Sequence, residues 1–194
     1  MSDPMSMFTP HPFQTRQAVR VLHAGGVIAY PTEAVYGLGC DPMDAAAVLR
    51  ILELKKRPWQ KGLILIASDR QQLDPFILPL SQELQTLLDE SWPGPITWLL
   101  PAHPEVPYWL RGEHNSIAVR VTAHAGTRVL CEAFGRAIVS TSANPATLPP
   151  ARSPLKVRRY FGDGLGMILH GPLGGRAQPS EIRDASSGRV IRAA

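Results

Sequence analysis

Residues 54–65 read LKKRPWQKGLIL, four cations followed directly by an apolar run. The run continues to residue 67 as LILIA, without the polar alternation of a strand that has one face in water. A short, continuously apolar segment of this kind is typical of a strand that is covered on both faces. The stretch therefore predicts a layered α/β domain with the cations at the entrance to a buried strand.

Helical and strand patterns follow one another on both sides of this segment. The apolar spacing and the capping residues predict helices over 15–26, 44–56, 81–90 and 125–134. Apolar runs predict strands over 27–30, 63–67, 96–100, 116–121, 137–140, 166–170 and 189–192. The strands cluster in the middle of the chain and near its C-terminus, so a strict doubly wound order is not kept. We expect a single-domain α/β fold with a twisted mixed sheet and flanking helices.

The composition is that of one globular domain. The chain has 194 residues, of which 44% are hydrophobic and 19% charged, and this balance excludes a disordered protein. The net charge of +4 is compatible with a polyanionic partner but does not require one. We expect residues 1–13 to be a flexible N-terminal tail and residues 14–194 to form the single folded domain.

The N-terminus has no signal-peptide pattern, and no apolar run reaches the length of a membrane span. These features predict a cytoplasmic protein that does not associate with a membrane. Cys40 and Cys131 lie far apart and form no ligand pattern, so we interpret them as buried free thiols. The six histidines show no ligand spacing either, and no metal site is predicted in the chain itself.

The stretch YPTEAVYGLGCD, residues 30–41, follows the first predicted strand. Thr32, Glu33 and Tyr36 bring polar groups to the end of that strand, where sites in α/β proteins usually gather. Gly37 and Gly39 permit backbone paths that other residues resist. A plain connection, in which Thr32 and Tyr36 cap backbone groups, remains an equal alternative.

The cations of the opening stretch have two interpretations. Pro58 disfavours helix at Arg57, and in an extended segment Lys55 and Arg57 would share one side and suit phosphate or carboxylate groups. A solvated helix end, favoured by the helix dipole, would also account for Lys55 and Lys56. It would leave Arg57 and Lys61 unexplained.

Two later predicted strands bring polar groups with them. One carries an arginine, and the other ends in a loop of small polar side chains. In SIAVRV, residues 116–121, Ala118 and Arg120 share one face of the predicted strand. Because a buried arginine needs an anionic partner, we expect an acidic residue of the fold or a ligand carboxylate beside Arg120. In VSTSANP, residues 139–145, small hydroxyl and amide side chains would allow close approach of a phosphate or a ribose.

Six stretches in order resemble one family. They are YPTEAVYGLGCD, KKRPWQKGLIL, WPGPIT, IAVRV, STSAN and QPSEIRDASSGRVIR, and they span the chain from about residue 15 to its end. Together they resemble the YrdC-like family of threonylcarbamoyl-adenylate (threonylcarbamoyl-AMP) synthases, in its short single-domain form. The resemblance implies a twisted mixed sheet around a concave, positively charged cavity.

The resemblance also implies a reaction. Members of the family join L-threonine, bicarbonate or dissolved CO₂, and ATP to give threonylcarbamoyl-AMP and pyrophosphate. Partner proteins then transfer the threonylcarbamoyl group to the tRNA adenosine next to the anticodon. Mg²⁺ is expected to act with the ATP phosphates.

Roles are implied for the matching residues. Threonine would be bound by Thr32, Arg120, Ser142 and Ser180. ATP would be bound by Lys55, Arg57, Lys61, Ser116, Ser142, Asn144 and Arg192, and the first three would also act on the reacting groups. The sequence departs from the family pattern in PATLPP, residues 145–150, and in PSEI, residues 179–182, which affects the loop expected over ATP and the one over threonine.

A non-catalytic RNA-binding or ribosome-assembly module is the alternative function that the basic charge suggests. The sequence has neither an RRM signature nor the GXXG loop of a KH domain. Weak contact with tRNA or other RNA is compatible with both functions.

Overall fold

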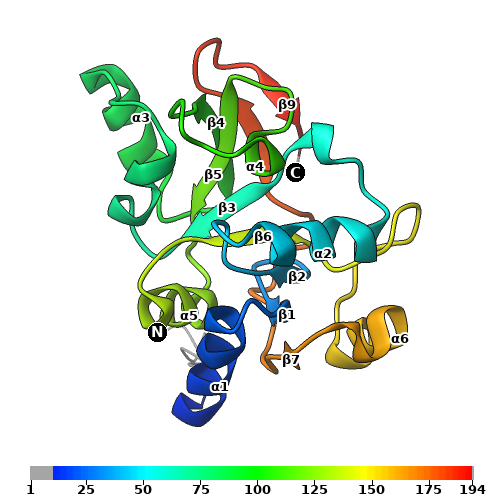
Figure 1. Ribbon diagram of the computed structural model, residues 1–194. Coiled ribbons are helices and arrows are strands. Elements are labelled where there is room, and N and C mark those ends of the chain that lie inside the picture. Colours follow the sequence, from blue (N-terminus) through cyan, green and yellow to red (C-terminus); the bar gives the residue numbers. More distant parts are fainter. Residues whose placement is uncertain (1–10, 194) are drawn as a thin grey trace, which may run out of the picture.

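The computed structural model describes residues 11–193, which form one nine-stranded sheet with helices on both faces (Figure 1). The strand order is β7-β1-β2-β6-β3-β5-β4-β8-β9, and the pairs β1–β7, β3–β5 and β4–β8 are parallel while the others are antiparallel. The prediction of a mixed sheet is therefore confirmed.

The strands are β1 (Ile28–Pro31), β2 (Tyr36–Gly39), β3 (Ile64–Ala67), β4 (Ile96–Pro101), β5 (Ser116–Val121), β6 (Ile138–Ser142), β7 (Met167–Ile168), β8 (Glu181–Asp184) and β9 (Val190–Arg192). The helices are α1 (Pro12–His23), α2 (Ala45–Lys55), α3 (Gln82–Ser91), α4 (Tyr108–Arg111), α5 (Ala125–Phe134) and α6 (Pro154–Phe161). Short 3-10 turns are η1 (Trp59–Lys61), η2 (Gln71–Phe76) and η3 (Gly162–Gly164).

The central strand β3 is covered on both faces, as its apolar run predicts. Leu65 and Ala67 belong to the larger core, which α2 helps to build, whereas Ile66 belongs to a second core under α1 and α5. Figure 1 shows α1 and α5 side by side, and their contacts with each other close this second core. Because successive strand residues point to opposite faces, both cores need apolar side chains at every position of β3.

Strand β6 joins the two halves of the sheet. On one side Leu38 of β2 pairs with Thr141, and on the other Leu65 of β3 pairs with Val139. The half that contains β1, β2 and β7 and the half that contains β3, β5, β4, β8 and β9 therefore meet at one strand. The C-terminal end of this strand carries the predicted Ser142.

The segment after β1 differs from the prediction, because Tyr36–Gly39 form strand β2 where we expected a loop. The glycines serve close packing rather than an unusual dihedral angle. A Cβ atom on Gly39 would lie 2.6 Å from the carbonyl oxygen of Val139 and 2.7 Å from Cε1 of Tyr30. Strand β8 and helices α4 and α6 were also not predicted.

The N-terminal boundary lies earlier than expected. Helix α1 begins at Pro12, so the predicted tail over residues 1–13 overlaps the helix by two residues, and residues 1–10 lie outside those that the structure describes. Asp44 and Ser81 cap α2 and α3 through their side chains, as predicted. Cys40 and Cys131 are buried free thiols, also as predicted. Within residues 11–193, every helix is too short or too polar to cross a membrane.

Candidate active site

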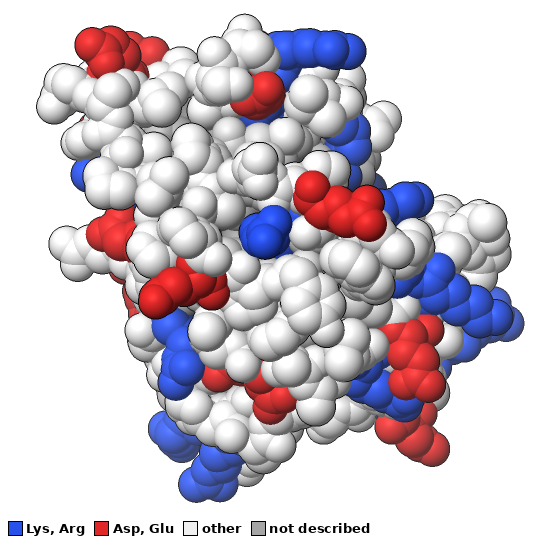
Figure 2. Space-filling model, turned by 45° about the horizontal axis from the view of Figure 1, so that its top comes forward, with Lys and Arg blue, Asp and Glu red and all other residues white. Residues whose placement is uncertain are grey.

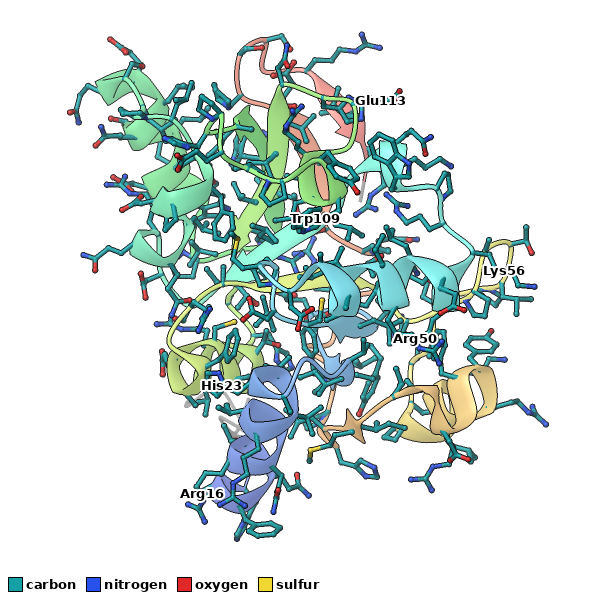
Figure 3. The ribbon with its side chains drawn as sticks, in the orientation of Figure 1. Arg16, His23, Arg50, Lys56, Trp109 and Glu113 are labelled. Atoms are coloured by element: carbon teal, nitrogen blue, oxygen red, sulfur yellow. The ribbon has the colours of Figure 1, made fainter. Side chains whose placement is uncertain are left out.

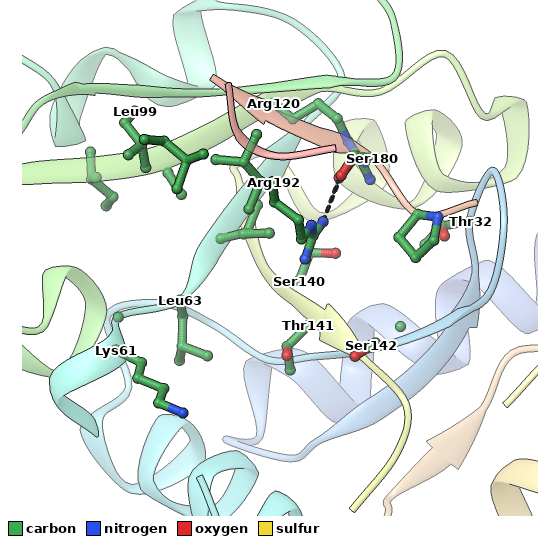
Figure 4. A pocket seen from close by; sticks show the side chains of 18 of the residues that line it. Thr32, Lys61, Leu63, Leu99, Arg120, Ser140, Thr141, Ser142, Ser180 and Arg192 are labelled. Atoms are coloured by element: carbon green, nitrogen blue, oxygen red, sulfur yellow. Dashed lines mark hydrogen bonds between the residues drawn. The ribbon is translucent and has the colours of Figure 1, made fainter. Parts of the chain in front are cut away.

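One cavity of about 460 Å³ collects side chains from almost the whole length of the chain (Figure 4). Its volume is in the range of small-molecule sites. Of the predicted site residues, Thr32, Arg57, Lys61, Ser116, Arg120, Ser142, Ser180 and Arg192 line it. Lys55 and Asn144 do not.

Small side chains at alternate strand positions make the room for this cavity. Ser116 and Ala118 lie at alternate positions of β5 before Arg120, and Ser140 and Ser142 do so along β6. Further along the same face, large apolar residues of β3 and β6 pack under α1 and α5 instead. The cavity is thus the part of this face that the two helices leave uncovered.

Arg120 forms an ion pair with Glu33 inside the cavity wall. Its Nη2 atom lies 3.2 Å from Oε2 of Glu33, and their side chains are only 7% and 11% exposed. Thr122 donates a hydrogen bond of 2.6 Å to Oε1 of Glu33. Burial alone would raise the pKa of Glu33, but Arg120 and the Thr122 hydrogen bond outweigh it, so the pKa lies below its ordinary value. Glu33 is the fold's own partner for Arg120, one of the two possibilities left open by the sequence.

The pair leaves one donor of Arg120 free. Its Nε atom is buried and has no hydrogen-bond partner among the described residues. Buried donors are normally satisfied, so an unpaired one in a cavity wall is suited to a ligand oxygen. Glu33 therefore fixes the orientation of the Arg120 guanidinium, while the Nε side of this group stays available to a ligand.

His124 is a buried residue near this ion pair that connects two segments of the chain. Its Nδ1 atom accepts a hydrogen bond of 3.2 Å from the backbone of Thr127, and its Nε2 atom lies 3.1 Å from the carbonyl oxygen of Pro172, which assigns the proton to Nε2. Burial lowers the pKa of His124, so the ring is neutral at pH 7. His124 thus ties the segment after β7 to the start of α5, and the amide of Gly174 in that segment donates to the carbonyl oxygen of Thr32 at 3.0 Å.

Thr32 and Tyr36 do cap backbone groups, as the alternative interpretation stated. The Thr32 hydroxyl donates to the carbonyl oxygen of Val35 at 2.7 Å, and the Tyr36 hydroxyl donates to that of Gly171 at 2.9 Å. Thr32 nevertheless lines the cavity, and Figure 4 shows it beside Ser180. Its oxygen keeps lone pairs that can accept a hydrogen bond from a ligand.

Three further cations of the cavity have no carboxylate partner: Arg57 and Lys61 at the end away from Glu33, and Arg192 between the two ends. Arg57 donates to the carbonyl oxygen of Gly62 at 3.0 Å, and its Nε atom is buried without a partner among residues 11–193. Lys61 extends toward the cavity from η1 (Figure 4). Arg192 donates to the carbonyl oxygen of Ser180 at 2.6 Å and to its hydroxyl at 3.3 Å. The ion pairs of the described residues include none of these three cations.

The lowered pKa values of Arg192 and Arg57 reflect burial and, for Arg192, the nearby positive charges. Partial burial lowers the pKa of Arg192, and the charges of Arg120 and Arg57 lower it further. Burial also lowers the pKa of Arg57. Since Glu33 neutralises Arg120, the cavity keeps an excess of positive charge that an anion would offset.

The face shown in Figure 2 carries Lys and Arg side chains interspersed with Asp and Glu. The positive charge of the cavity comes from its own lining residues, among them Arg57, Lys61 and Arg192.

Lys55 occupies a different place from the predicted one. Helix α2 extends to Lys55, and Lys56 then takes a left-handed conformation with φ 52° and ψ 44°. This turn separates Lys55 from Arg57, so the predicted extended segment with both side chains on one side is wrong. Lys55 is buried against Ser142 and Asn144, while Lys56 lies exposed at the helix end (Figure 3).

Some lining residues had no predicted role. They include Glu33, Ser140 and Arg176. The requirement for an anion beside Arg120 was the sequence signal for Glu33, because PTE is a polar stretch with an acidic residue at the end of a predicted strand. The alternation of Ser140 with Ser142 in β6 was the signal for Ser140. Arg176 lies in an irregular segment, where no periodicity could have indicated it.

Comparison with known proteins gives a consistent result. Residues 20–194 match the family model Sua5_yciO_yrdC, described as "Telomere recombination". A protein named threonylcarbamoyl-AMP synthase from Nitrosococcus oceani is 54% identical over 180 residues, which are 93% of this chain and 97% of that protein. Another of the same name from Alkalilimnicola ehrlichii is 56% identical, covering 93% and 96%.

Solved structures agree with the fold. Sua5 of P. abyssi, complexed with L-threonine, superposes with a TM-score of 0.86 at 32% identity, and the match covers 93% of this chain and 53% of that one. The chain thus spans about half the length of that protein. YciO of E. coli gives a TM-score of 0.81 at 29% identity, covering 95% and 91%.

Proposed function

Because the chain belongs to the Sua5/YciO/YrdC family, we propose that it is a threonylcarbamoyl-AMP synthase, an enzyme that joins L-threonine, bicarbonate or CO₂, and ATP. Relatives that are about half identical over nearly their whole length carry this name. The observation that carries the proposal is the convergence of Arg57, Arg120 and Arg192 on one cavity in which a single carboxylate pairs with Arg120.

The Arg120 end suits the amino acid. The unpaired Nε–H of Arg120 would donate a hydrogen bond to the threonine carboxylate, while Thr32 and Ser180 offer oxygens close by. Glu33 holds the guanidinium in place and keeps this end close to neutral. A small zwitterion binds such an end without bringing an unbalanced charge into it.

The Arg57 end suits the nucleotide. Arg57, Lys61 and Arg192 would bind the triphosphate, and the Ser116 hydroxyl would donate a hydrogen bond to it. The Ser142 hydroxyl, whose proton is donated to Asn144, would accept a hydrogen bond from a ribose hydroxyl. Arginine forks match phosphate oxygens, and the charge of a triphosphate offsets the crowding of these cations.

The reaction needs positioning more than a protein base. Threonine and CO₂ give a carbamate whose oxygen attacks the α-phosphorus of ATP, and the P–O bond to pyrophosphate breaks. The cavity holds the two anions side by side, and its cations stabilise the negative charge that moves to pyrophosphate. Glu33 has a lowered pKa and stays ionised in its pair with Arg120, so it has no part in proton transfer.

Mg²⁺ would arrive with ATP. No group of three or more His, Cys, Asp or Glu side chains among residues 11–193 is arranged to hold a metal ion. The phosphates and water are the ligands that Mg²⁺ commonly keeps in such sites, and it would neutralise phosphate charge there. We further propose a cytoplasmic enzyme whose product passes to the proteins that transfer the threonylcarbamoyl group to tRNA.

An RNA-binding module is less well supported than the enzyme. A module of that kind needs neither the buried Arg120–Glu33 pair nor a small enclosed cavity, and the face in Figure 2 carries charges of both signs. Weak contact with tRNA or other RNA stays a prediction.

The test is a threonine-dependence assay. Purified protein with Mg-ATP, bicarbonate and pyrophosphatase should release phosphate, and the adenylate or AMP should accumulate, when L-threonine is added. The matched control omits threonine and should give at most a background rate. ATP consumption that is the same with and without threonine would contradict the proposal.

A further inference from the structure

Lys55 is a buried cation held by backbone rather than by a carboxylate. The residue is 6% exposed. Its Nζ atom donates to the carbonyl oxygen of Ser142, to that of Asn144 at 2.8 Å, and to Oδ1 of Asn144 at 3.4 Å. An ammonium has three protons, so these acceptors use its whole donor capacity.

The acceptors all belong to the turn after β6. Within that turn the Ser142 hydroxyl donates to Oδ1 of Asn144 at 2.6 Å, and Nδ2 of Asn144 donates to the carbonyl oxygen of Leu148 at 2.7 Å. The backbone of Lys55 takes part as well, because its carbonyl oxygen accepts from the amide of Ala146 at 2.9 Å. The end of α2 therefore fastens residues 142–148 by both side chain and backbone.

An ammonium in this place is costly. Burial, together with the charge of Arg57, lowers the pKa of Lys55 to about 8. The turn faces Lys55 with carbonyl and amide oxygens, which carry partial charges only. A buried cation of this kind is retained where its hydrogen bonds matter for geometry.

We propose that Lys55 is a positioning residue, which fixes the Ser142–Asn144 turn so that Ser142 faces the nucleotide, and that it does not itself bind phosphate. The inference rests on the proposed function for the identity of the ligand, but its geometric part concerns the ligand-free protein. The Lys55 side chain lies outside the cavity lining, whereas Ser142 is part of it. Asn144 acts through the same turn.

Amide hydrogen exchange of the segment 142–148, measured without substrates, tests the geometric part. In Lys55→Met the turn loses its three hydrogen bonds, and exchange there should speed up by about tenfold or more. Lys55→Gln keeps a shorter neutral donor, so its exchange should lie between those of Lys55→Met and the wild type. Lys56→Asn is the matched control, since Lys56 is exposed and asparagine tolerates its left-handed conformation.

The assay with ATP separates positioning from phosphate binding. We expect the KM for ATP to rise in the same order as the exchange rate, with Lys55→Gln between Lys55→Met and the wild type. A phosphate contact would instead make Lys55→Gln as poor as Lys55→Met and leave exchange at 142–148 unchanged, which would overturn the inference. If Lys55→Met does not fold, the comparison of Lys55→Gln with the wild type decides. If the wild type proves inactive, the exchange experiment still decides the geometric part.

Discussion

The two ends of the cavity hold their arginines in opposite ways. At one end Arg120 is paired with the buried carboxylate of Glu33, which Thr122 holds in turn. Arg57 at the other end, and Arg192 between the two ends beside Ser180, have carbonyl and hydroxyl oxygens as partners. The fold thus neutralises one guanidinium and leaves the others in excess, so the second end depends on its ligand for charge balance.

Arginines of one site can therefore differ in role: Arg120 stabilises the fold as well as the proposed ligand, whereas Arg57 is available mainly to the ligand. Removing Arg120 leaves a buried carboxylate without its counter-charge, which costs stability as well as binding. Removing Arg57 takes away one of several crowded cations, which relieves repulsion in the ligand-free protein. The following predictions test this asymmetry.

The largest effect is expected for Arg120→Met. Turnover with threonine should fall about 1000-fold, equivalent to about 4 kcal/mol, because the side chain is proposed to hold the reacting amino acid. The protein should also unfold at a lower temperature, since Glu33 loses its counter-charge. Steady-state kinetics with varied threonine and a thermal melt would measure the two losses.

The double variant Arg120→Met/Glu33→Gln is the control for this prediction. It removes the unpaired carboxylate, so it should regain much of the melting temperature lost in Arg120→Met while staying inactive with threonine. Recovery of both properties together would show that Arg120 acts by stabilising the fold alone.

A smaller effect is expected for Arg57→Met. The kcat/KM for ATP should fall about 100-fold, equivalent to about 2.7 kcal/mol, through loss of one phosphate contact. The melting temperature should change little, because no ion pair of the described residues includes Arg57. Arg50→Met is a suitable control, since Arg50 lies on the outer surface in an exposed pair with Glu53 (Figure 3). A strong loss of stability in Arg57→Met would remove the contrast between the two ends.

The smallest effect concerns pH. The pKa of Glu33 is lowered in the folded protein, so its contribution to stability is present above the unfolded value of 4.5 and is lost as pH falls through the lower folded value. At pH 7 we expect Glu33→Gln to be less stable than the wild type by about 1.5 kcal/mol, the size of one hydrogen bond to a charged group. The gap should close as the pH is lowered below 4.5 in denaturant titrations. A gap that stays constant over this range would mean that Glu33 is not the ionised partner of Arg120.

Much of this contrast could be predicted from periodicity. The alternation in SIAVRV placed Arg120 on the same face as Ala118, and the structure confirms that both line the cavity. The expected burial of Arg120 also required an anionic partner, and this partner is Glu33. A strand with a period of two is a local rule, so one sequence was sufficient to apply it.

The prediction failed where partners distant in sequence decide the geometry. The helix predicted over 44–56 does reach Lys55, but the Lys55 side chain finds acceptors 87 and 89 residues further along the chain instead of sharing one side with Arg57. Likewise, Gly37 and Gly39 concealed β2, since glycine is a poor strand former. Pairing with β1 and β6 overrides that tendency.

The position of β8 in the sheet has a consequence for the order of folding. It lies parallel to β4, and their paired residues Ile96 and Glu181 are separated by most of the central sequence. Long-range pairing of this kind forms slowly and late. Ser180 and Arg192 stand beside or within β8 and β9, so a chain in which β8 has not yet joined β4 has most of its buried core but lacks two residues of the cavity. Ligand binding is therefore expected to appear later in refolding than the burial of the core.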